Sequence, residues 1–344
     1  MTDGMTLQSA ESPLNERYDA ALLDLDGVVY VGSAPVPAAP EAVDKARAAG
    51  MRVAFVTNNA ARTPARVAER LTSMGVGAAP EDVVTSAEAA ARLVSERFPA
   101  GSAVLVVGDT GLRLALRQRG LRPVSTAAER PVAVIQGYSP RLSYDLMVQG
   151  ALAVADGALF VSANNDATAP LDLGVQPGNG AAARVIAHAT GKEPVVAGKP
   201  MRPLHEEGVL RTGAEAPLVV GDRLDTDIES ATVRGAAGLL VFSGVTSPAQ
   251  AVIAPPEHRP SFLAWDLSGI NQPHPHVRME SGDAHCGGWT AALRAGRLRL
   301  SGRGERLDGL RALCACAWAA HPDGPVPDGS CDEALAELGL PEDD

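Results

Sequence analysis

The sequence lacks an excess of basic residues, any long apolar run and, before residue 286, any cysteine. Acidic residues outnumber basic ones by 41 to 30, so the formal net charge is −11. Because nucleic-acid binding requires a basic face, this balance argues against a nucleic-acid partner. No apolar run approaches the roughly 20 residues of a membrane span, so we expect no membrane partner either.

The N-terminal residues and the positions of the cysteines indicate the cellular compartment in which we expect the chain. Residues 1–17 are polar and show no basic start followed by an apolar core, so we expect no signal peptide. All 4 cysteines lie after residue 285, so most of the chain carries no disulfide framework. A reducing cytoplasm is the simplest location for such a chain.

Short apolar strands alternate with helical segments along most of the chain. Ala20–Leu23 is apolar without polar alternation, which is typical of a strand buried on both faces of a parallel sheet. Glu41–Ala49 has a helical composition and stops at Gly50, and Met51–Val56 is a second buried strand. The alternation continues to a strand at Gly238–Phe242. This order predicts an α/β protein with a doubly wound parallel sheet.

Polar residues follow several of these strands where each one ends. They are Asp24 and Asp26, Thr57 with Asn58 and Asn59, Lys199, and Asp222 with Asp227. In a doubly wound sheet the carboxyl ends of the strands share one crevice. Carboxylate oxygens suit a hard cation, for which Mg²⁺ is the best candidate, and a lysine offsets the charge of another anion. Together these residues predict a phosphate held between a metal ion and a lysine.

Taken singly, each of these residues also has an ordinary structural interpretation. Thr57-Asn58-Asn59 can be a loop with a helix cap, and Lys199 can be a solvated surface residue. Asp222 and Asp227 can be turn residues, and Asp225 is expected to cap the following helix. That all of them coincide by accident is improbable.

The motifs resemble those of the haloacid dehalogenase-like (HAD) phosphatases. The matching segments are D-L-D-G-V at 24–28, T-N-N at 57–59, G-K-P at 198–200 and G-D-R-L-D-T-D-I at 221–228. The resemblance implies a Rossmann-like core and a role for each residue. Asp24 would be the nucleophile that becomes an aspartyl phosphate, and Asp26 would be the acid and then the base.

The same resemblance implies how the phosphate and the metal would be held. Thr57, helped by Asn58 and the following Asn59, would bind phosphate oxygens, and Lys199 would stabilise charge on the nucleophile and the phosphoryl group. Asp222 would bind Mg²⁺ directly with Asp24 and the backbone carbonyl of Asp26. Asp227 would anchor metal-bound water.

The spacing of the motifs predicts where a cap domain is inserted. About 140 residues separate Thr57 from Lys199, well beyond one strand–helix unit. We therefore predict a catalytic core at 1–87 and 179–265 and an inserted α/β cap at 88–178, in the position of the type-two (C2) cap of the NagD-like, p-nitrophenyl-phosphatase-like subfamily. Segments 160–166 and 177–180 resemble cap segments of that subfamily, although Asn165 stands where it usually has a proline. The candidate specificity residues, which are equally plain loop formers, are Asn164, Asp166 and Asn179.

The chain beyond about Pro255 changes character. We predict a small α+β appendage at 272–344, with a hairpin turning at Ala295-Gly296 and a helix at Arg306–Ala320. The whole arrangement resembles glycerol-3-phosphate phosphatases that carry a degenerate acetyltransferase-like extension, and we expect no acetyl transfer. The histidines and cysteines here lack the usual zinc spacing, so packing cysteines and surface histidines are the better interpretation than a zinc site.

We therefore predict a cytoplasmic, Mg²⁺-dependent phosphomonoesterase that acts on a small phosphorylated metabolite. Glycerol 3-phosphate is the first candidate, with phosphoglycolate and pyridoxal 5′-phosphate as rivals. The alternative from a different class is a sensory or binding module that accepts a phosphoryl group on Asp24 and keeps it. The sequence does not indicate the physiological substrate, the purpose of the appendage or the oligomeric state, and a homodimer is left open.

Overall fold

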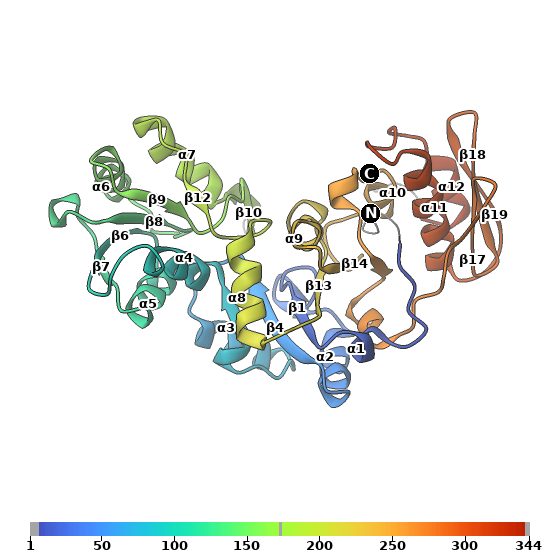
Figure 1. Cartoon of the computed structure of the whole chain (residues 1–344), viewed down its shortest axis with the longest axis horizontal. Coiled ribbons are helices and arrows are strands. Elements are labelled where there is room, and N and C mark those ends of the chain that lie inside the picture. Colours follow the sequence, from blue (N-terminus) through green and yellow to red (C-terminus); the bar gives the residue numbers. More distant parts are fainter. Residues whose placement is uncertain (1–6, 172–173, 341–344) are drawn as a thin grey trace. The chain divides into compact units, whose positions relative to one another are not determined.

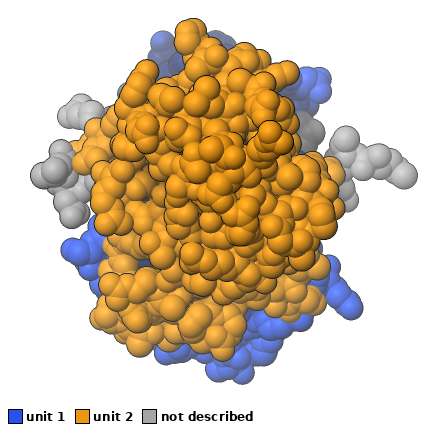
Figure 2. All heavy atoms as spheres, turned by 90° about the vertical axis from the view of Figure 1, so that its left-hand side faces the viewer, with its two compact units in different colours: residues 1–53, 214–344 blue, residues 54–213 orange. Residues whose placement is uncertain are grey.

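The computed structural model describes residues 7–171 and 174–340 of the chain. The chain divides into two compact units, which are residues 1–53 with 214–344, and residues 54–213 (Figure 2). No helix among the described residues is long and apolar enough to cross a membrane. The predicted boundary at residue 178 falls inside the second unit, and the predicted division into core, cap and appendage stays a prediction.

The first unit is built on parallel strands whose order is β15-β14-β13-β1. These strands are β1 (Ala20–Leu23), β13 (Pro217–Gly221), β14 (Ala237–Val241) and β15 (Phe262–Ala264). Every residue of β1 is buried, as the unbroken apolar run predicts. Helices in this unit include α1 (Leu14–Arg17), α2 (Ala39–Ala48), α9 (Glu229–Arg234) and α10 (Pro248–Val252). The predicted α/β class with parallel strands is confirmed.

The C-terminal part of the first unit is an antiparallel sheet that packs against helices (Figure 1). Its strands and helices are β16 (Arg278–Glu280), β17 (Asp283–Cys286), β18 (Trp289–Arg294), β19 (Arg297–Gly302), α11 (Arg306–Ala320) and α12 (Asp332–Glu337). The β18–β19 turn lies at Ala295-Gly296, where both residues have positive φ, as a tight hairpin turn requires. This turn and the bounds of α11 agree with the sequence prediction.

This C-terminal part shares one apolar core with the parallel sheet. Ile228, Leu240, Val252 and Leu263 of the sheet region cluster with side chains of α11, α12 and the antiparallel strands. The largest of these is Trp318, which is 2% exposed and donates its indole N–H to the carbonyl of Val252 at 3.1 Å. Helix α11 and its neighbours therefore cover apolar surface that the rest of the unit presents.

Arg259 adds polar contacts between the parallel-sheet region and the C-terminal part. Its side chain is 3% exposed and donates to the carbonyls of Ala254, His321 and Gly324 at 3.1, 2.7 and 2.9 Å. Its guanidinium also lies 5.7 Å from the ring centroid of Trp318. A buried guanidinium whose donors are met by carbonyls ties down the backbone segments that carry them.

The second unit contains a parallel sheet with the strand order β12-β9-β8-β6-β7. Its strands are β6 (Ala103–Val107), β7 (Arg122–Val124), β8 (Ala133–Gln136), β9 (Leu159–Ser162) and β12 (Val195–Val196). Helices α6 (Tyr144–Ala155) and α7 (Asn179–Thr190) lie on one face, and α4 (Ser86–Ser95) and α5 (Thr110–Gln118) on the other (Figure 1). Val134, Phe160 and Ile186 are buried in the core between the sheet and the first helix pair.

A strand pair that belongs to the second unit from Ala54 onwards carries polar residues at its ends. β4 (Arg52–Thr57) pairs in parallel with β5 (Val83–Thr85), and Thr57 lies opposite Thr85. Helix α3 (Pro64–Ser73) begins after Thr63, whose hydroxyl accepts the N–H of Arg66. This unit also contains the antiparallel pair β10 (Thr168–Leu171) and β11 (Gly174–Pro177), and helix α8 (Arg202–Thr212).

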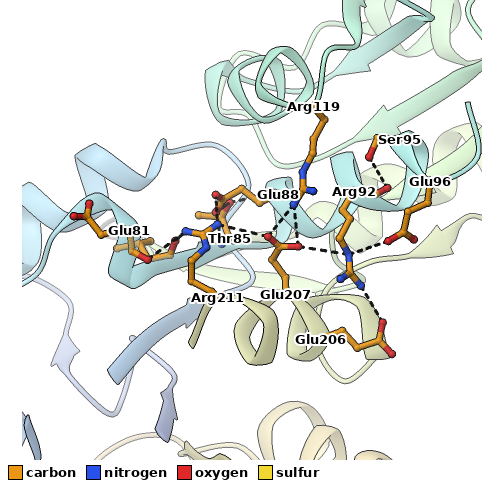
Figure 3. Close-up of polar contacts among 11 residues, drawn as sticks. Glu81, Thr85, Glu88, Arg92, Ser95, Glu96, Arg119, Glu206, Glu207 and Arg211 are labelled. Atoms are coloured by element: carbon orange, nitrogen blue, oxygen red, sulfur yellow. Dashed lines mark hydrogen bonds and ion pairs between the residues drawn. The ribbon is translucent and has the colours of Figure 1, made fainter. Parts of the chain in front are cut away.

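Helices α4 and α8 and the C-terminal end of α5 are joined by a network of arginines and glutamates (Figure 3). Glu207 is its centre: the carboxylate is 5% exposed and pairs with Arg119 at 3.0 Å. Arg92 and Arg211 each place a nitrogen 3.5 Å from the same carboxylate. Glu88 takes a further bond from Arg211 at 2.9 Å. One buried anion thus balances cations from three helical segments.

Glu207→Ala is expected to lower the free energy of unfolding by about 3 kcal/mol, because it leaves the partly buried guanidiniums without their shared anion. Glu206 offers a matched control, since it pairs with Arg92 at 3.0 Å but is 36% exposed. Glu206→Ala is expected to cost under about 1 kcal/mol, as exposed ion pairs do. Urea unfolding followed by circular dichroism measures both, and equal losses in the two variants would contradict the central role of Glu207.

Candidate active site

Two aspartates of the first unit lie side by side because their strands are neighbours. Leu23 and Val220 are paired residues of β1 and β13, and the next residue but one after Val220 is Asp222. The N–H of Asp24, which directly follows β1, donates to the carbonyl of Val220 at 2.9 Å. The carboxyl ends of two adjacent parallel strands therefore bring Asp24 and Asp222 to the same edge of the sheet, as the sequence predicts.

The carboxylate of Asp222 is enclosed by backbone. Its side chain is 1% exposed, and its Oδ2 accepts the N–H of Val245 at 2.7 Å. A Cβ on Gly27 or on Gly244 would lie 2.2 or 2.0 Å from that oxygen, so neither position has room for a side chain. Gly27 also has φ +82°, which favours glycine. The hydroxyl of Ser243 donates to the carbonyl of Gly27 at 2.6 Å and so holds Gly27 in place.

Asp227 reaches the same place from a π-helical turn at Leu224–Ile228. It is 1% exposed, and its Oδ2 accepts the N–H of Arg223 at 3.2 Å. A Cβ on Gly221 would lie 2.1 Å from the Cβ of Asp227, so only glycine permits this approach. Wide turns of this kind occur often at functional sites, where they redirect a side chain.

The prediction that Asp225 caps the following helix is wrong. Asp225 lies inside the π-helical turn, whose N-cap is Arg223, and α9 begins after Ile228. Its carboxylate accepts hydrogen bonds from the guanidinium of Arg223 at 3.0 and 2.7 Å. Burial acts to raise the pKa of Asp225, but the bonds from Arg223 outweigh burial and hold the pKa below its usual value.

The three aspartates suit a divalent cation. One carboxylate oxygen each of Asp24, Asp222 and Asp227 lies within 4.8 Å of the others, and this is the sole such group of histidine, cysteine and acidic residues in the described part of the chain. Hard oxygen donors at this spacing fit Mg²⁺, whose ligands surround it at about 2.0–2.1 Å. The carboxylate of Asp26 is not in the group; it is exposed and accepts the hydroxyl of Tyr30 at 3.4 Å.

In the second unit, Thr57 is the last residue of β4, and Asn58 and Asn59 begin the loop that follows it. Thr57 is 5% exposed, and its hydroxyl oxygen accepts the N–H of Asn59 at 3.1 Å. The side-chain carbonyl of Asn59 accepts the N–H groups of Ala61 and Arg62 at 2.9 and 3.2 Å, which holds the loop in shape. The amide of Asn58 instead points to Asp166 and to the backbone of Lys199.

Lys199 lies beside this loop although it is far away in the sequence. Its ammonium group donates to the carbonyl of Val56 at 3.3 Å, and the residue is 6% exposed. It is therefore not the solvated surface lysine of the alternative interpretation. The structure brings Lys199 together with Thr57, Asn58 and Asn59, which the sequence predicted to act on the same phosphate.

The predicted cap residues Asn164 and Asn179 are buried, with 3% and 2% exposure. The amide of Asn164 donates to the carbonyl of Asn58 at 2.7 Å. The amide of Asn179 donates to the hydroxyl of Ser162 and to the carbonyl of Asn164 at 2.9 and 2.8 Å. Both amide groups thus hold the loop at 162–166 in place. Asp166, the third predicted cap residue, is half-buried.

The histidines and cysteines of the C-terminal part form no metal cluster among the described residues. All the cysteines are free and buried, and burial raises the pKa of the Cys286 thiol to about 12. His274 is 3% exposed, packs edge-on against Phe262 and contacts the carbonyl of Gly269. Burial lowers its pKa to about 4. The cysteines pack, as the sequence predicts, whereas the prediction that the histidines lie at the surface is wrong for His274.

Sequence reasoning missed the loop after β14. Ser243, Gly244 and Val245 hold Gly27 and Asp222 in place, yet the sequence reading stopped at the strand that precedes them. A signal was present: Ser243-Gly244 lies two residues beyond the end of a buried strand of the parallel sheet, at the edge where the aspartates were expected. A further missed residue is Ser162, which orients Asn164 and Asn179.

Comparisons with known proteins show which family the chain belongs to. A family model described as haloacid dehalogenase-like hydrolase matches residues 21–122, and a second HAD-hydrolase-like model matches residues 196–270. D-glycerol 3-phosphate phosphatase of Mycobacterium tuberculosis is 38% identical over 315 residues, covering 89% of this chain and 87% of the relative. The chain therefore belongs to the haloacid dehalogenase-like hydrolases.

Other relatives and solved structures are also similar to this chain. The 5′-nucleotidase YutF of Bacillus subtilis is 36% identical over 231 residues, covering 67% of this chain and 89% of the relative. The crystal structure of the glycerol phosphate phosphatase of M. tuberculosis with magnesium superposes with a TM-score of 0.86 at 37% identity, covering 96% of this chain and 99% of that one. NagD of Escherichia coli superposes with a TM-score of 0.67 at 28% identity, covering 73% and 97%.

The predicted class of enzyme, a phosphatase of the NagD-like branch of this family, is confirmed. The predicted likeness of the appendage to acetyltransferases is also confirmed, because a GCN5-related N-acetyltransferase-like domain model matches residues 286–340. The expectation that this region transfers no acetyl group stays a prediction.

Proposed function

We propose that this chain hydrolyses the phosphomonoester of a small phosphorylated metabolite, with Mg²⁺ as cofactor, and that glycerol 3-phosphate is its preferred substrate. The observation that carries the proposal is the group formed by the partly buried Asp24 and the buried Asp222 and Asp227. The 38% identical relative is a D-glycerol 3-phosphate phosphatase, and the matching crystal structure contains magnesium. Phosphoglycolate and pyridoxal 5′-phosphate are the rival substrates.

In this proposal Asp24 attacks phosphorus and the bond from phosphorus to the alcohol oxygen breaks. Asp26 gives a proton to that oxygen as it leaves, and then takes a proton from the water that hydrolyses the aspartyl phosphate. A carboxylate that approaches a phosphate dianion is repelled. Mg²⁺ held by Asp24, Asp222 and the backbone carbonyl of Asp26, with Asp227 on its water, would supply the positive charge that offsets this repulsion.

Thr57 and its loop would bind the phosphate oxygens, and Lys199 would stabilise charge on the phosphoryl group as it transfers. The burial of Lys199 supports this role, because a desolvated ammonium interacts more strongly with an anion than one in water does. That Lys199 and the three aspartates serve the same phosphoryl group is part of the proposal. It is supported by the order of the family motifs along the chain.

A panel of phosphorylated metabolites tests the substrate. With Mg²⁺ present, kcat/KM is expected to be highest for glycerol 3-phosphate. Phosphoglycolate or pyridoxal 5′-phosphate ahead of it by tenfold or more would move the assignment to that compound while leaving the reaction in place.

Metal removal tests the cofactor. Chelation with EDTA followed by desalting is expected to lower kcat by more than about 100-fold, because neutralising the charge at the reacting centre contributes several kcal/mol. Added Mg²⁺ is expected to restore the activity. Full activity after chelation would contradict the metal site. A stable phosphoprotein that accumulates after incubation with acetyl phosphate would favour the phospho-accepting module instead.

The cytoplasmic location and the absence of nucleic-acid and membrane partners stay predictions, and a homodimer stays open.

A further inference from the structure

The side chain of Asn58 brackets the backbone of Lys199. Its carbonyl oxygen accepts the N–H of Lys199 at 2.8 Å, and its NH₂ group lies 3.4 Å from the carbonyl of the same residue. A Cβ on Gly198 would lie 2.5 Å from the Asn58 oxygen, so the residue before the lysine leaves the space that this approach needs. One amide therefore holds both polar groups of the lysine backbone.

Asp166 determines which way that amide faces. The NH₂ group of Asn58 donates to its carboxylate oxygens at 3.1 and 3.4 Å. If the amide rotated by 180°, its oxygen would meet the carboxylate and its NH₂ group would meet the N–H of Lys199, and both contacts would be repulsive. The carboxylate of Asp166 thus selects the orientation that holds Lys199.

The backbone of Asn58 is held as well. Its backbone carbonyl accepts hydrogen bonds from the hydroxyl of Ser86 at 2.6 Å and from the side-chain amide of Asn164 at 2.7 Å. Asn164 and Asp166 lie in one loop after β9, in the segment predicted as cap. The loop therefore reaches the lysine through a single intermediate side chain. A displacement of about 1 Å at a reacting centre costs on the order of 100-fold in rate, so a clamp on the lysine backbone matters to catalysis.

We propose that Asn58 and Asp166 are positioning residues that hold Lys199, and that neither acts by contacting the substrate. The inference rests on the proposed role of Lys199 in phosphoryl transfer. It replaces the roles that the sequence suggested for these two residues, which were phosphate binding for Asn58 and substrate selection for Asp166.

An exchange of donor and acceptor tests the clamp. Asn58→Asp keeps an acceptor for the N–H of Lys199 but faces Asp166 with a second carboxylate, so kcat is expected to fall by about 100-fold. Adding Asp166→Asn supplies an amide donor to the new carboxylate and restores the missing hydrogen bond. The pair Asn58→Asp/Asp166→Asn is expected to recover at least tenfold of the lost kcat. Without any recovery, the clamp is disproved.

A cycle with the lysine separates positioning from other roles. If Asp166 acts through Lys199, Asp166→Ala is expected to lower kcat by about tenfold alone and by less than twofold in a Lys199→Ala background, measured as single turnovers at high enzyme concentration. Equal losses in the two backgrounds would overturn the inference. Unchanged activity in Lys199→Ala would instead overturn the proposed role of the lysine, so the two failures are distinguishable.

The choice of substrate gives a second readout. A residue that holds Lys199 affects every phosphomonoester alike, whereas a residue that contacts the alcohol part affects only some. Asp166→Ala is therefore expected to lower kcat/KM by the same factor, within threefold, for glycerol 3-phosphate and for p-nitrophenyl phosphate. A loss confined to glycerol 3-phosphate would assign Asp166 to substrate recognition. Asn165→Ala, in the exposed neighbouring residue, serves as control and is expected to leave both values unchanged.

Discussion

Asp24→Asn is expected to lower kcat by at least about 10⁴-fold, because an amide cannot replace the carboxylate that attacks phosphorus. The change keeps the size of the side chain and leaves the N–H that bonds Val220 in place, so the fold should not change. It also removes one of the three carboxylates that lie within 4.8 Å of one another, which weakens the metal site. Initial rates with saturating Mg²⁺ and glycerol 3-phosphate measure the effect.

Asp225→Asn is the matched control for this experiment. Asp225 belongs to the same acidic motif as Asp222 and Asp227, but its carboxylate pairs with Arg223 and is outside the group of three. The kcat of Asp225→Asn is expected to stay within about threefold of that of the unmodified enzyme, because an exposed ion pair contributes little to stability. If Asp24→Asn kept more than 1% of the activity, or if both variants lost the same amount, Asp24 would not be the nucleophile.

Removal of all residues after Asn271 is expected to leave a chain that does not fold stably. The deletion would expose Leu240, Val252 and Leu263, whose apolar surface is covered by α11 and its neighbours. Each large apolar side chain that loses its cover costs about 1.5–3 kcal/mol, and a whole protein is stable by only about 5–15 kcal/mol. Arg259 would also lose its carbonyl partners at residues 321 and 324.

The test is the soluble yield and the thermal unfolding of the truncated chain beside the full chain. A truncated protein that is soluble, monodisperse and melts within 3 °C of the full chain would contradict the shared core. Trp318→Ala in the full chain gives a second measurement that does not depend on recovering the truncated protein. It is expected to lower the free energy of unfolding by about 3–5 kcal/mol, because it opens a cavity where the indole is buried.

The parts of the fold that the sequence predicted well are those that depend on local pattern. The bounds of β1 and α11 and the turn at Ala295-Gly296 agree with the structure. In each case neighbouring residues carry the signal: an unbroken apolar run, apolar residues at helical spacing, and a glycine in a tight turn. The neighbouring positions of Asp24 and Asp222 were predictable for a similar reason, because polar residues at the ends of adjacent parallel strands meet. The place of Lys199 was not, because β12 pairs with β9 in a different sheet.

The parts that the sequence did not predict depend on contacts between distant segments. Nothing in the sequence near Glu207 indicates that arginines 92, 119 and 211 converge on it. The shared core around Trp318 was equally hidden, since an amphipathic helix shows that it buries a face but not which surface it covers. Asp225 was misassigned because an aspartate before a helix is typical of an N-cap, and nothing local in the sequence shows that a π-helical turn precedes α9.

The absence of side chains at Gly27 and Gly244 limits how this enzyme can be re-engineered. Any larger residue at either position would push on the Asp222 oxygen, so a cavity tailored to a bigger ion cannot be made by substitution there. Attempts to change ion preference are better directed at the π-helical turn that presents Asp227.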